Sequence, residues 1–278
     1  DYSKMVAYHK EKNASCTVAS IEVPLEEASR FGILNVNEDN SIYEFEEKPK
    51  KPKSTKASMG VYVFTWSKLQ VYLKEDEDAK SSKDFGKNVL PNMLNSGEKL
   101  FAYDFHGYWK DVGTIESLWE SNMDLLNPNT KFDLNDDSFK VYSRSPVMPP
   151  QYIADTAKVK NSIISDGCNI YGNVDFSVLF NGVYIGKDAS IQESIIMPGV
   201  KIEPGASVKY AIISENTIVR KGAKIGAKPH EVSKGEKWGI TVIGDNIVIG
   251  DDVEIKAKSM IKDSIMHNEK SRKEVAIV

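Results

Sequence analysis

Hydrophobic residues recur at intervals of six along the second half of the chain. Ile243, Ile249, Ile255 and Ile261 keep this interval without a break. Three such six-residue repeats close one triangular coil of a left-handed parallel β-helix, with the aliphatic side chain pointing inward. A β-sandwich would alternate with a period of two, and helices with a period of 3.6. The pattern therefore predicts a β-helix over residues 151–278, and the same spacing links Ile153 with Val159, Ile164 with Ile170, Ile185 with Ile191, Ile196 with Ile202 and Val208, and Ile213 with Val219 and Ile225.

The first half mixes two other periodicities. Stretches rich in Val, Ile, Tyr and Phe predict strands at 17–23, 41–46, 60–64 and 100–105. Apolar residues three and four apart predict helices at 3–12, 66–73, 85–94 and 115–126, and Asp84 is placed to cap the third. The acidic run at 75–78 is expected to be a solvated loop rather than a metal cluster. We therefore expect a mixed α/β domain over 1–127.

Residues 128–150 carry no hydrophobic period. They contain Pro128, Pro146, Pro149 and Pro150 together with several Asn and Asp. Proline and asparagine interrupt regular structure. We therefore expect a linker over 128–150 between the two domains.

Bulk composition excludes some classes of function. Hydrophobic residues make up 41% and charged residues 27%, and the formal net charge is −4, so no basic surface for a nucleic acid is expected. No apolar run approaches the roughly 20 residues that cross a bilayer, so no membrane partner is expected. Cys16 and Cys168 are far apart, which favours reduced structural thiols in a cytoplasmic protein.

Residues 227–241 interrupt the six-residue register and contain His230 among several lysines. A β-helical acyltransferase would need a histidine near such a loop, so that reading stays open. We expect an ordinary surface loop here, because one histidine without a partner at a catalytic spacing is a weak signal.

Five short motifs in the first half point to chemistry. In chain order they are Arg30-Phe31-Gly32, Phe45-Glu46-Glu47-Lys48-Pro49, residues 57–64 (ASMGVYVF), residues 82–87 (SKDFGK) and residues 108–114 (YWKDVGT). Taken one at a time each has a plain structural explanation: Lys48 an exposed turn, Asp84 a helix cap, Tyr62 and Phe85 core, Asp111 the start of a turn. Together and in this order they closely resemble the bacterial glucose-1-phosphate adenylyltransferases (ADP-glucose pyrophosphorylases).

The resemblance covers nearly the whole chain and implies a fold, a reaction and a set of site residues. The fold implied is the C-terminal portion of a Rossmann-like (GT-A-like) nucleotidyltransferase domain followed by the left-handed β-helix. The reaction implied is attack of glucose 1-phosphate on the α-phosphate of ATP, giving ADP-glucose for glycogen synthesis and pyrophosphate. Lys48 would contact the sugar phosphate, and Asp111 would hold Mg²⁺ as one of two metal-binding aspartates. The glucose 1-phosphate pocket would be lined by Gly32, Glu47, Lys48, Ser58, Tyr62, Asp84, Phe85 and Trp109.

The resemblance also implies what this sequence lacks. Residues 1–5 look like the segment just after the family's Gly-Asp-His strand, and no glycine-rich phosphate loop follows them. We therefore expect that the nucleotide loop and the first metal aspartate lie outside these residues, and that this chain alone is inactive.

Three other readings remain open from the residues. The parent could be a pyrophosphorylase for another sugar phosphate or base, since base choice lies outside these motifs. It could be a non-catalytic regulatory subunit, although Lys48 and Asp111 are both present. It could be a solenoid acyltransferase. For the preferred reading, the family implies a homotetramer formed through the β-helix and small-molecule allosteric effectors.

Overall fold

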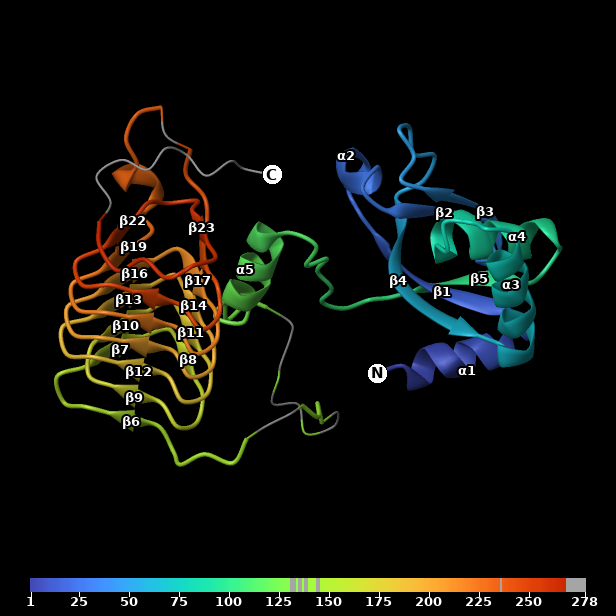
Figure 1. The fold of residues 1–278 in the computed structure, drawn as a ribbon. Helices are drawn as coiled ribbons and strands as arrows, with labels where there is room; N and C mark the ends of the chain where they lie inside the picture. The colour runs from blue at the N-terminus through green and yellow to red at the C-terminus, as the bar shows by residue number, and fades with distance from the viewer. Residues whose placement is uncertain (131–133, 135–136, 138–139, 144–145, 236, 269–278) are drawn as a thin grey trace. The chain divides into compact units, whose positions relative to one another are not determined.

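The computed structural model describes residues 1–130, 134, 137, 140–143, 146–235 and 237–268. The chain divides into two compact units, Asp1–Gly107 and Tyr108–Val278 (Figure 1). Part of the expected linker at 128–150 lies outside the described residues. The described residues contain no helix that is both long and apolar enough to span a membrane.

The first unit is built on one five-stranded sheet with the order β3-β2-β4-β1-β5 (Figure 1). Strand β1 runs parallel to β5 and antiparallel to β4, and β2 and β3 form an antiparallel pair. The elements of this unit are α1 (Ser3–Glu11), β1 (Cys16–Glu22), α2 (Leu25–Ala28), β2 (Gly32–Val36), β3 (Ile42–Glu47), β4 (Lys56–Phe64), α3 (Trp66–Asp78), the π-helical turn η1 (Phe85–Val89), α4 (Leu90–Asn95) and β5 (Leu100–Asp104).

Helices bury their apolar faces against this sheet. Leu90 and Met93 of α4 form one cluster of buried residues with Val18, Leu34 and Leu100 of the strands. The turn between β2 and β3 reaches the far edge strand, where the amide of Ala102 donates to the Asn40 carbonyl at 2.9 Å. A bridge between Ser41 and Phe101 joins the same two segments, so the turn of the β2–β3 pair, which carries several of the candidate site residues, is tied to β5.

Two sequence expectations for this unit need correction. The acidic residues 75–78 form the last turn of α3 rather than a loop, because the helix continues until Ala79, whose amide donates to the Glu75 carbonyl. Strand β2 and helix α2 were not predicted. Strand β2 reads GILNV, which is too short to establish a period, and α2 is a single turn.

The second unit contains the expected β-helix. Its three parallel sheets of six strands each have the orders β6-β9-β12-β15-β18-β21, β7-β10-β13-β16-β19-β22 and β8-β11-β14-β17-β20-β23 when followed from the first coil (Figure 1). The strands are β6 (Tyr152–Ile153), β7 (Lys158–Lys160), β8 (Ile163–Ile164), β9 (Asn169–Ile170), β10 (Asn173–Asp175), β11 (Val178–Leu179), β12 (Tyr184–Ile185), β13 (Ser190–Gln192), β14 (Ile195–Ile196), β15 (Lys201–Ile202), β16 (Ser207–Lys209), β17 (Ala211–Ile213), β18 (Ile218–Val219), β19 (Lys224–Ile225), β20 (Thr241–Ile243), β21 (Val248–Ile249), β22 (Glu254–Ile255) and β23 (Met260–Ile261).

The six-residue repeat becomes three vertical ladders of side chains. Ile153, Ile170, Ile185, Ile202, Val219 and Ile249 are register partners from coil to coil, and the other two sheets repeat this pattern. From Ile170 to Ile249 this ladder is fully buried in the core, whereas Ile153 in the first coil is 46% exposed. The predicted left-handed β-helix is thereby confirmed. Val174 and Leu179 also belong to the ladders, at two positions that the sequence analysis did not include in the repeat.

One sheet of the β-helix is apolar on its outer face as well. Val178, Ile195 and Ile212 point away from the coil interior, yet each is at most 5% exposed. Helix α5 (Ile115–Asp124) covers them, contributing Met123 to the same cluster, with Leu126 just beyond its end (Figure 1). The sequence placed this helix in the first domain; its contacts put it in the second unit.

The loop at 227–241, which interrupts the repeat, packs against the β-helix through Trp238. The indole of Trp238 donates to the Ala227 carbonyl at 2.8 Å and meets the Tyr210 ring edge-on at 5.1 Å. Lys209 pairs with Glu231 at 2.7 Å, and His230 is exposed. The geometry therefore gives His230 the character of a surface residue.

Candidate active site

The carboxylate of Glu47 is the centre of the candidate site in the first unit. Glu47 ends β3 and is the register partner of Gly32, the first residue of β2. A methyl group at Gly32 would lie 2.5 Å from Cζ of Phe45 and 3.0 Å from Oε2 of Glu47. Only glycine leaves room for these two side chains, so Gly32 is required here for space.

Lys48 projects from the turn that follows β3. Its backbone has a φ of 49°, in the left-handed region. The turn is held because the Lys48 amide donates to the Phe31 carbonyl at 3.1 Å. Its ammonium lies 4.0 Å from Oε1 of Glu47; the side chains of Lys48 and Glu47 are 65% and 22% exposed. The lysine head is therefore held near the carboxylate while facing solvent, where it can meet an anionic ligand.

A β-bulge in β4 sets the positions of Ser58 and Tyr62. The register of β4 against β1 shifts between Ser20 and Val18, and Gly60 at the shift has a φ of +70°. The hydroxyl of Ser58 accepts from the Gly60 amide at 3.2 Å, which closes the bulge. The bulge lies between Ser58 and Tyr62, the register partners of Ser20 and Val18.

An aromatic group forms the neighbouring wall. The ring of Phe85 stacks on Tyr62 at 5.8 Å and lies 5.6 Å from Phe64. Burial raises the pKa of the Tyr62 phenol; the hydrogen bond with Ser58 lowers it, and the negative charges of Glu47 and Asp84 raise it further. Tyr62 therefore stays neutral and acts as a hydroxyl in a partly apolar wall that both carboxylates influence.

Asp84 is a helix cap, as its position before η1 predicted. Its Oδ1 accepts from the Lys87 amide at 2.9 Å, and its own amide donates to Oδ1 of Asn88 at 3.2 Å. The cap fixes the start of the turn that carries Phe85. A hydrogen-bonded cap oxygen does not preclude a second role for the other carboxylate oxygen.

Trp109 and Asp111 belong to the second unit, so the structure describes them apart from the other candidates. The segment before α5 is tied to that helix: the Tyr108 hydroxyl donates to Asp124 at 2.9 Å, and Lys110 pairs with Asp124 at 3.2 Å. Burial and the bond to Asp124 raise the pKa of Tyr108 to about 12. Asp111 is exposed beside Gly113, whose added methyl would lie 3.4 Å from Oδ1.

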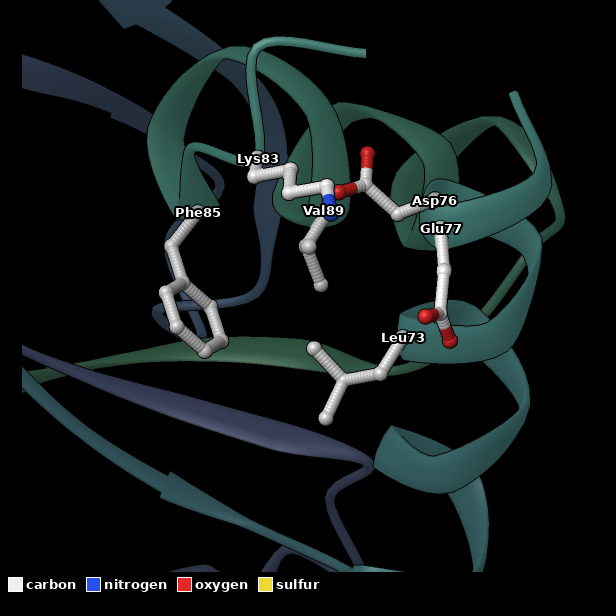
Figure 2. Close-up of a pocket in the computed structure, with 6 residues that line it drawn as sticks. All are labelled: Leu73, Asp76, Glu77, Lys83, Phe85 and Val89. Carbon is white, nitrogen blue, oxygen red and sulfur yellow. The ribbon is translucent and has the colours of Figure 1, made fainter. Parts of the chain in front are cut away.

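A shallow pocket of about 210 Å³ has Phe85 in its lining (Figure 2). In Figure 2 the side chains of Lys83 and Asp76 point toward one another across its rim. Of its lining residues, Phe85 belongs to the candidate set, so this pocket is a neighbour of the site rather than the site itself. The lining consists of Leu73, Asp76, Glu77, Lys83, Phe85 and Val89.

Two residues at the site were missed by the sequence reasoning, although both stand inside its motifs. Phe45 packs its ring against the two positions that lack side chains, Gly32 and Gly86. Gly86, in η1, is buried against the Glu47 carboxylate. The motifs could have indicated both residues, because Phe45 is the first residue of the motif that contains Glu47 and Gly86 directly follows Phe85.

Metal binding was tested against the donor groups in the described residues. No three His, Cys, Asp or Glu side chains there come together in a way that could hold a metal ion. Asp111 supplies one hard carboxylate oxygen, of the type that Mg²⁺ prefers. Because Mg²⁺ in phosphate-transferring enzymes takes one or two carboxylates and fills its other positions with substrate phosphates and water, a single aspartate fits part of such a site.

Comparisons with known proteins agree with this architecture. Residues 1–128 match the Nucleotidyl transferase family, and residues 149–244 match the GlmU-like C-terminal hexapeptide family. The chain therefore combines a nucleotidyl transferase region with a hexapeptide-repeat β-helix.

Similar proteins from several bacteria are named glucose-1-phosphate adenylyltransferase. The chain is 55% identical over 255 residues to the protein of Clostridium beijerinckii, covering 91% of this chain and 64% of that protein. It is 54% identical over 274 residues to that of Clostridium botulinum strain Eklund 17B, covering 98% and 65%. For Desulforamulus reducens the identity is 52% over 254 residues, covering 90% and 62%.

The resemblance deduced from the motifs is thereby confirmed: at least nine tenths of the chain is similar to proteins named glucose-1-phosphate adenylyltransferase. It spans slightly less than two thirds of the length of these relatives, between 62% and 65% for the three named.

Proposed function

We propose that this chain is part of an enzyme that makes ADP-glucose and pyrophosphate from ATP and glucose 1-phosphate for glycogen synthesis. The observation that carries the proposal is the grouping around Glu47. A carboxylate, a solvent-facing ammonium, two hydroxyls and an aromatic wall come together from β3 and the turn after it, from β4 and from η1. The chain that carries them is 55% identical to a protein named glucose-1-phosphate adenylyltransferase.

Each group suits one part of glucose 1-phosphate. Glu47 is assigned to the sugar hydroxyls, because an ionised carboxylate accepts hydrogen bonds from them. Lys48 is assigned to the phosphate as a point charge. Tyr62 and Phe85 offer apolar area with the Ser58 hydroxyl beside them, and Gly32 lets the backbone approach the sugar. Asp84 and Trp109 are assigned to the same pocket by the family resemblance.

Asp111 is assigned to Mg²⁺. When bound, the metal neutralises charge that builds on the α-phosphate and the leaving pyrophosphate. The contribution of this chain is one carboxylate from the segment that Tyr108 and Lys110 anchor to α5. The remaining ligands would come from the substrates and from the aspartate that the resemblance implies outside these residues.

The wider assignments rest on the same relatives. We propose a cytoplasmic homotetramer that associates through the β-helix and responds to small-molecule effectors. The exposed Ile153 and Val159 at the first coil support self-association, because solenoids cover their open ends with a cap or a partner. Light scattering of the full-length protein at tens of micromolar should give a mass above the monomer; a strict monomer would contradict this.

Two variants of the full-length protein test the site assignments. Lys48 contacts a phosphate present in both ground and transition states, so Lys48→Ala should raise KM for glucose 1-phosphate about ten- to a hundredfold and change kcat little. Asp111→Asn should lower kcat by orders of magnitude with a small change in that KM. Lys50→Ala, an exposed neighbour, is the control and should change neither.

The same kinetics separate the alternatives. A pyrophosphorylase for another sugar or base would turn over a different substrate pair faster than ATP with glucose 1-phosphate. A regulatory subunit would bind glucose 1-phosphate without turnover in the full-length protein. An acyltransferase would bind acyl-coenzyme A. Loss of kcat alone in Lys48→Ala, or normal turnover in Asp111→Asn, would contradict the residue roles.

A further inference from the structure

Gly86 lies against the carboxylate at the centre of the site. A methyl group built on Gly86 would lie 2.6 Å from Oε2 of Glu47 and 3.1 Å from Cε1 of Phe45. Gly32, on the neighbouring strand, would place its methyl 3.0 Å from the same Oε2. The oxygen therefore occupies a slot between two residues without side chains, and the ring of Phe45 lies against the same two residues.

The reason for a glycine at position 86 is space rather than backbone freedom. Gly86 is absent from the glycines of the first unit that have a positive φ, Gly60 and Gly97, so an alanine could adopt its conformation. Its place is fixed by the cap at Asp84 and by the Leu90 amide, which donates to the Phe85 carbonyl. A side chain here would therefore act on its neighbour and not on the turn.

The neighbour that would move is the carboxylate. Oε2 is the far end of a flexible side chain, and Glu47 keeps 22% exposure, so it has room to turn aside. The other oxygen, Oε1, lies 4.0 Å from the Lys48 ammonium. The slot therefore fixes Oε2 of Glu47 and leaves Oε1 on the side of Lys48. A ligand that carries both hydroxyls and a phosphate would meet Oε1 and the Lys48 ammonium there.

We propose that Gly86 is a positioning residue: by leaving this space empty, it sets the orientation of the Glu47 carboxylate toward the sugar of glucose 1-phosphate. This assignment rests on the proposed function. Gly86 acts through Glu47 and makes no contact with the substrate itself.

The test is a KM-against-kcat comparison in the full-length protein. Gly86→Ala should raise KM for glucose 1-phosphate about ten- to a hundredfold, the range for one charge-assisted hydrogen bond, with KM for ATP and the melting temperature little changed. Gly239→Ala is the control, because it too lacks a positive φ and the atoms nearest its methyl would be methylenes of the Lys258 side chain, the first at 3.0 Å. Equal loss for ATP and glucose 1-phosphate, or an unchanged KM, would overturn the assignment.

A double-mutant cycle separates a clash with Glu47 from a general effect of the alanine on the fold. Glu47→Asp withdraws the carboxylate by one methylene, so Gly86→Ala added to it should cost little more than Glu47→Asp alone. Additive losses in the double variant would overturn the assignment.

The proposed function has its own point of failure. If the unaltered full-length protein makes no ADP-glucose, the proposed function is wrong. The role of Gly86 is then tested separately, by calorimetric titration with glucose 1-phosphate. Weaker binding by Gly86→Ala than by Gly239→Ala supports the slot, and equal binding overturns it.

Discussion

Replacing Ile195 by alanine tests whether α5 is an integral layer of the β-helix. Ile195 is the first residue of β14, points out of the coil and is fully buried in the cluster that contains Met123 of α5. Ile218 is the first residue of β18 and also points out, on a sheet that α5 does not cover, where it stays partly exposed. The two substitutions remove the same atoms from the same strand position.

The structure sets the expected difference between these two variants. Truncation of a fully buried isoleucine to alanine costs about 2–4 kcal/mol, from lost burial and the cavity left behind. At Ile218 much of the removed surface already faces water, so the cost should be about 1 kcal/mol. Guanidinium unfolding followed by tryptophan fluorescence measures both, because Trp119 and Trp238 pack against the same cluster. Equal costs for Ile195→Ala and Ile218→Ala would refute the packing.

A double-mutant cycle shows whether the cost arises from α5. Met123 is 5% exposed, and its truncation together with Ile195 should give a coupling of about 0.5–2 kcal/mol, as expected for residues that share one cavity. Glu116→Ala, on the exposed face of α5, should change stability by less than about 0.5 kcal/mol. Strict additivity of the Ile195 and Met123 truncations would contradict the packing of α5 against this sheet.

Three further predictions concern stability. Burial raises the pKa of Asp104, but hydrogen bonds from Lys56 and Ser20 lower it more, so the net shift is downward. The stabilisation from this shift is present above the ordinary aspartate pKa near 3.9 and is lost as pH falls below it. Because the Asp104 side chain is 37% exposed, solvent screens the pair, and Asp104→Asn should cost about 0.5–1 kcal/mol at pH 7 and flatten that acid loss in urea titrations at several pH values. Gly226→Ala should lower the melting temperature well beyond Gly205→Ala, since both have φ near +70° but the first methyl would collide with the backbone of the neighbouring coil, and equal shifts would contradict this. Lys224→Ala should leave the unfolding free energy unchanged within experimental error at 0.15 M salt, because its ion pair is exposed on both sides; a measurable loss would contradict that account.

The sequence by itself determined the β-helix. The inward residue of each repeat meets the same kind of residue one coil away, so the spacing of Ile243, Ile249, Ile255 and Ile261 is enough to specify a ladder in each sheet. A solenoid contacts mainly its nearest coils, which makes its pattern local and readable. The ordered motifs likewise identified the residues around Glu47, because each motif is a short contiguous segment.

Only the tertiary structure decided what covers the outer face of the sheet β8–β23. A signal was present, because the strands of this sheet read II, VL, II, AII, TVI and MI, with two apolar residues side by side. Such a doublet is compatible with burial of both faces but does not establish it, since Ile218 of the doublet in β18 stays partly exposed. It also does not identify the segment that covers the outer face. The answer came from Ile195 and Met123 meeting across about 70 residues of chain.

The slot around Glu47 was decided in the same way. Phe45 and Glu47 alternate with outward residues on β3, whereas Gly32 and Gly86 come from a strand and a turn that are distant in the sequence. The sequence shows a glycine at each position and gives no reason for it. The reason is the close approach of one carboxylate and one ring, and a distance between side chains from separate elements exists only after the chain has folded.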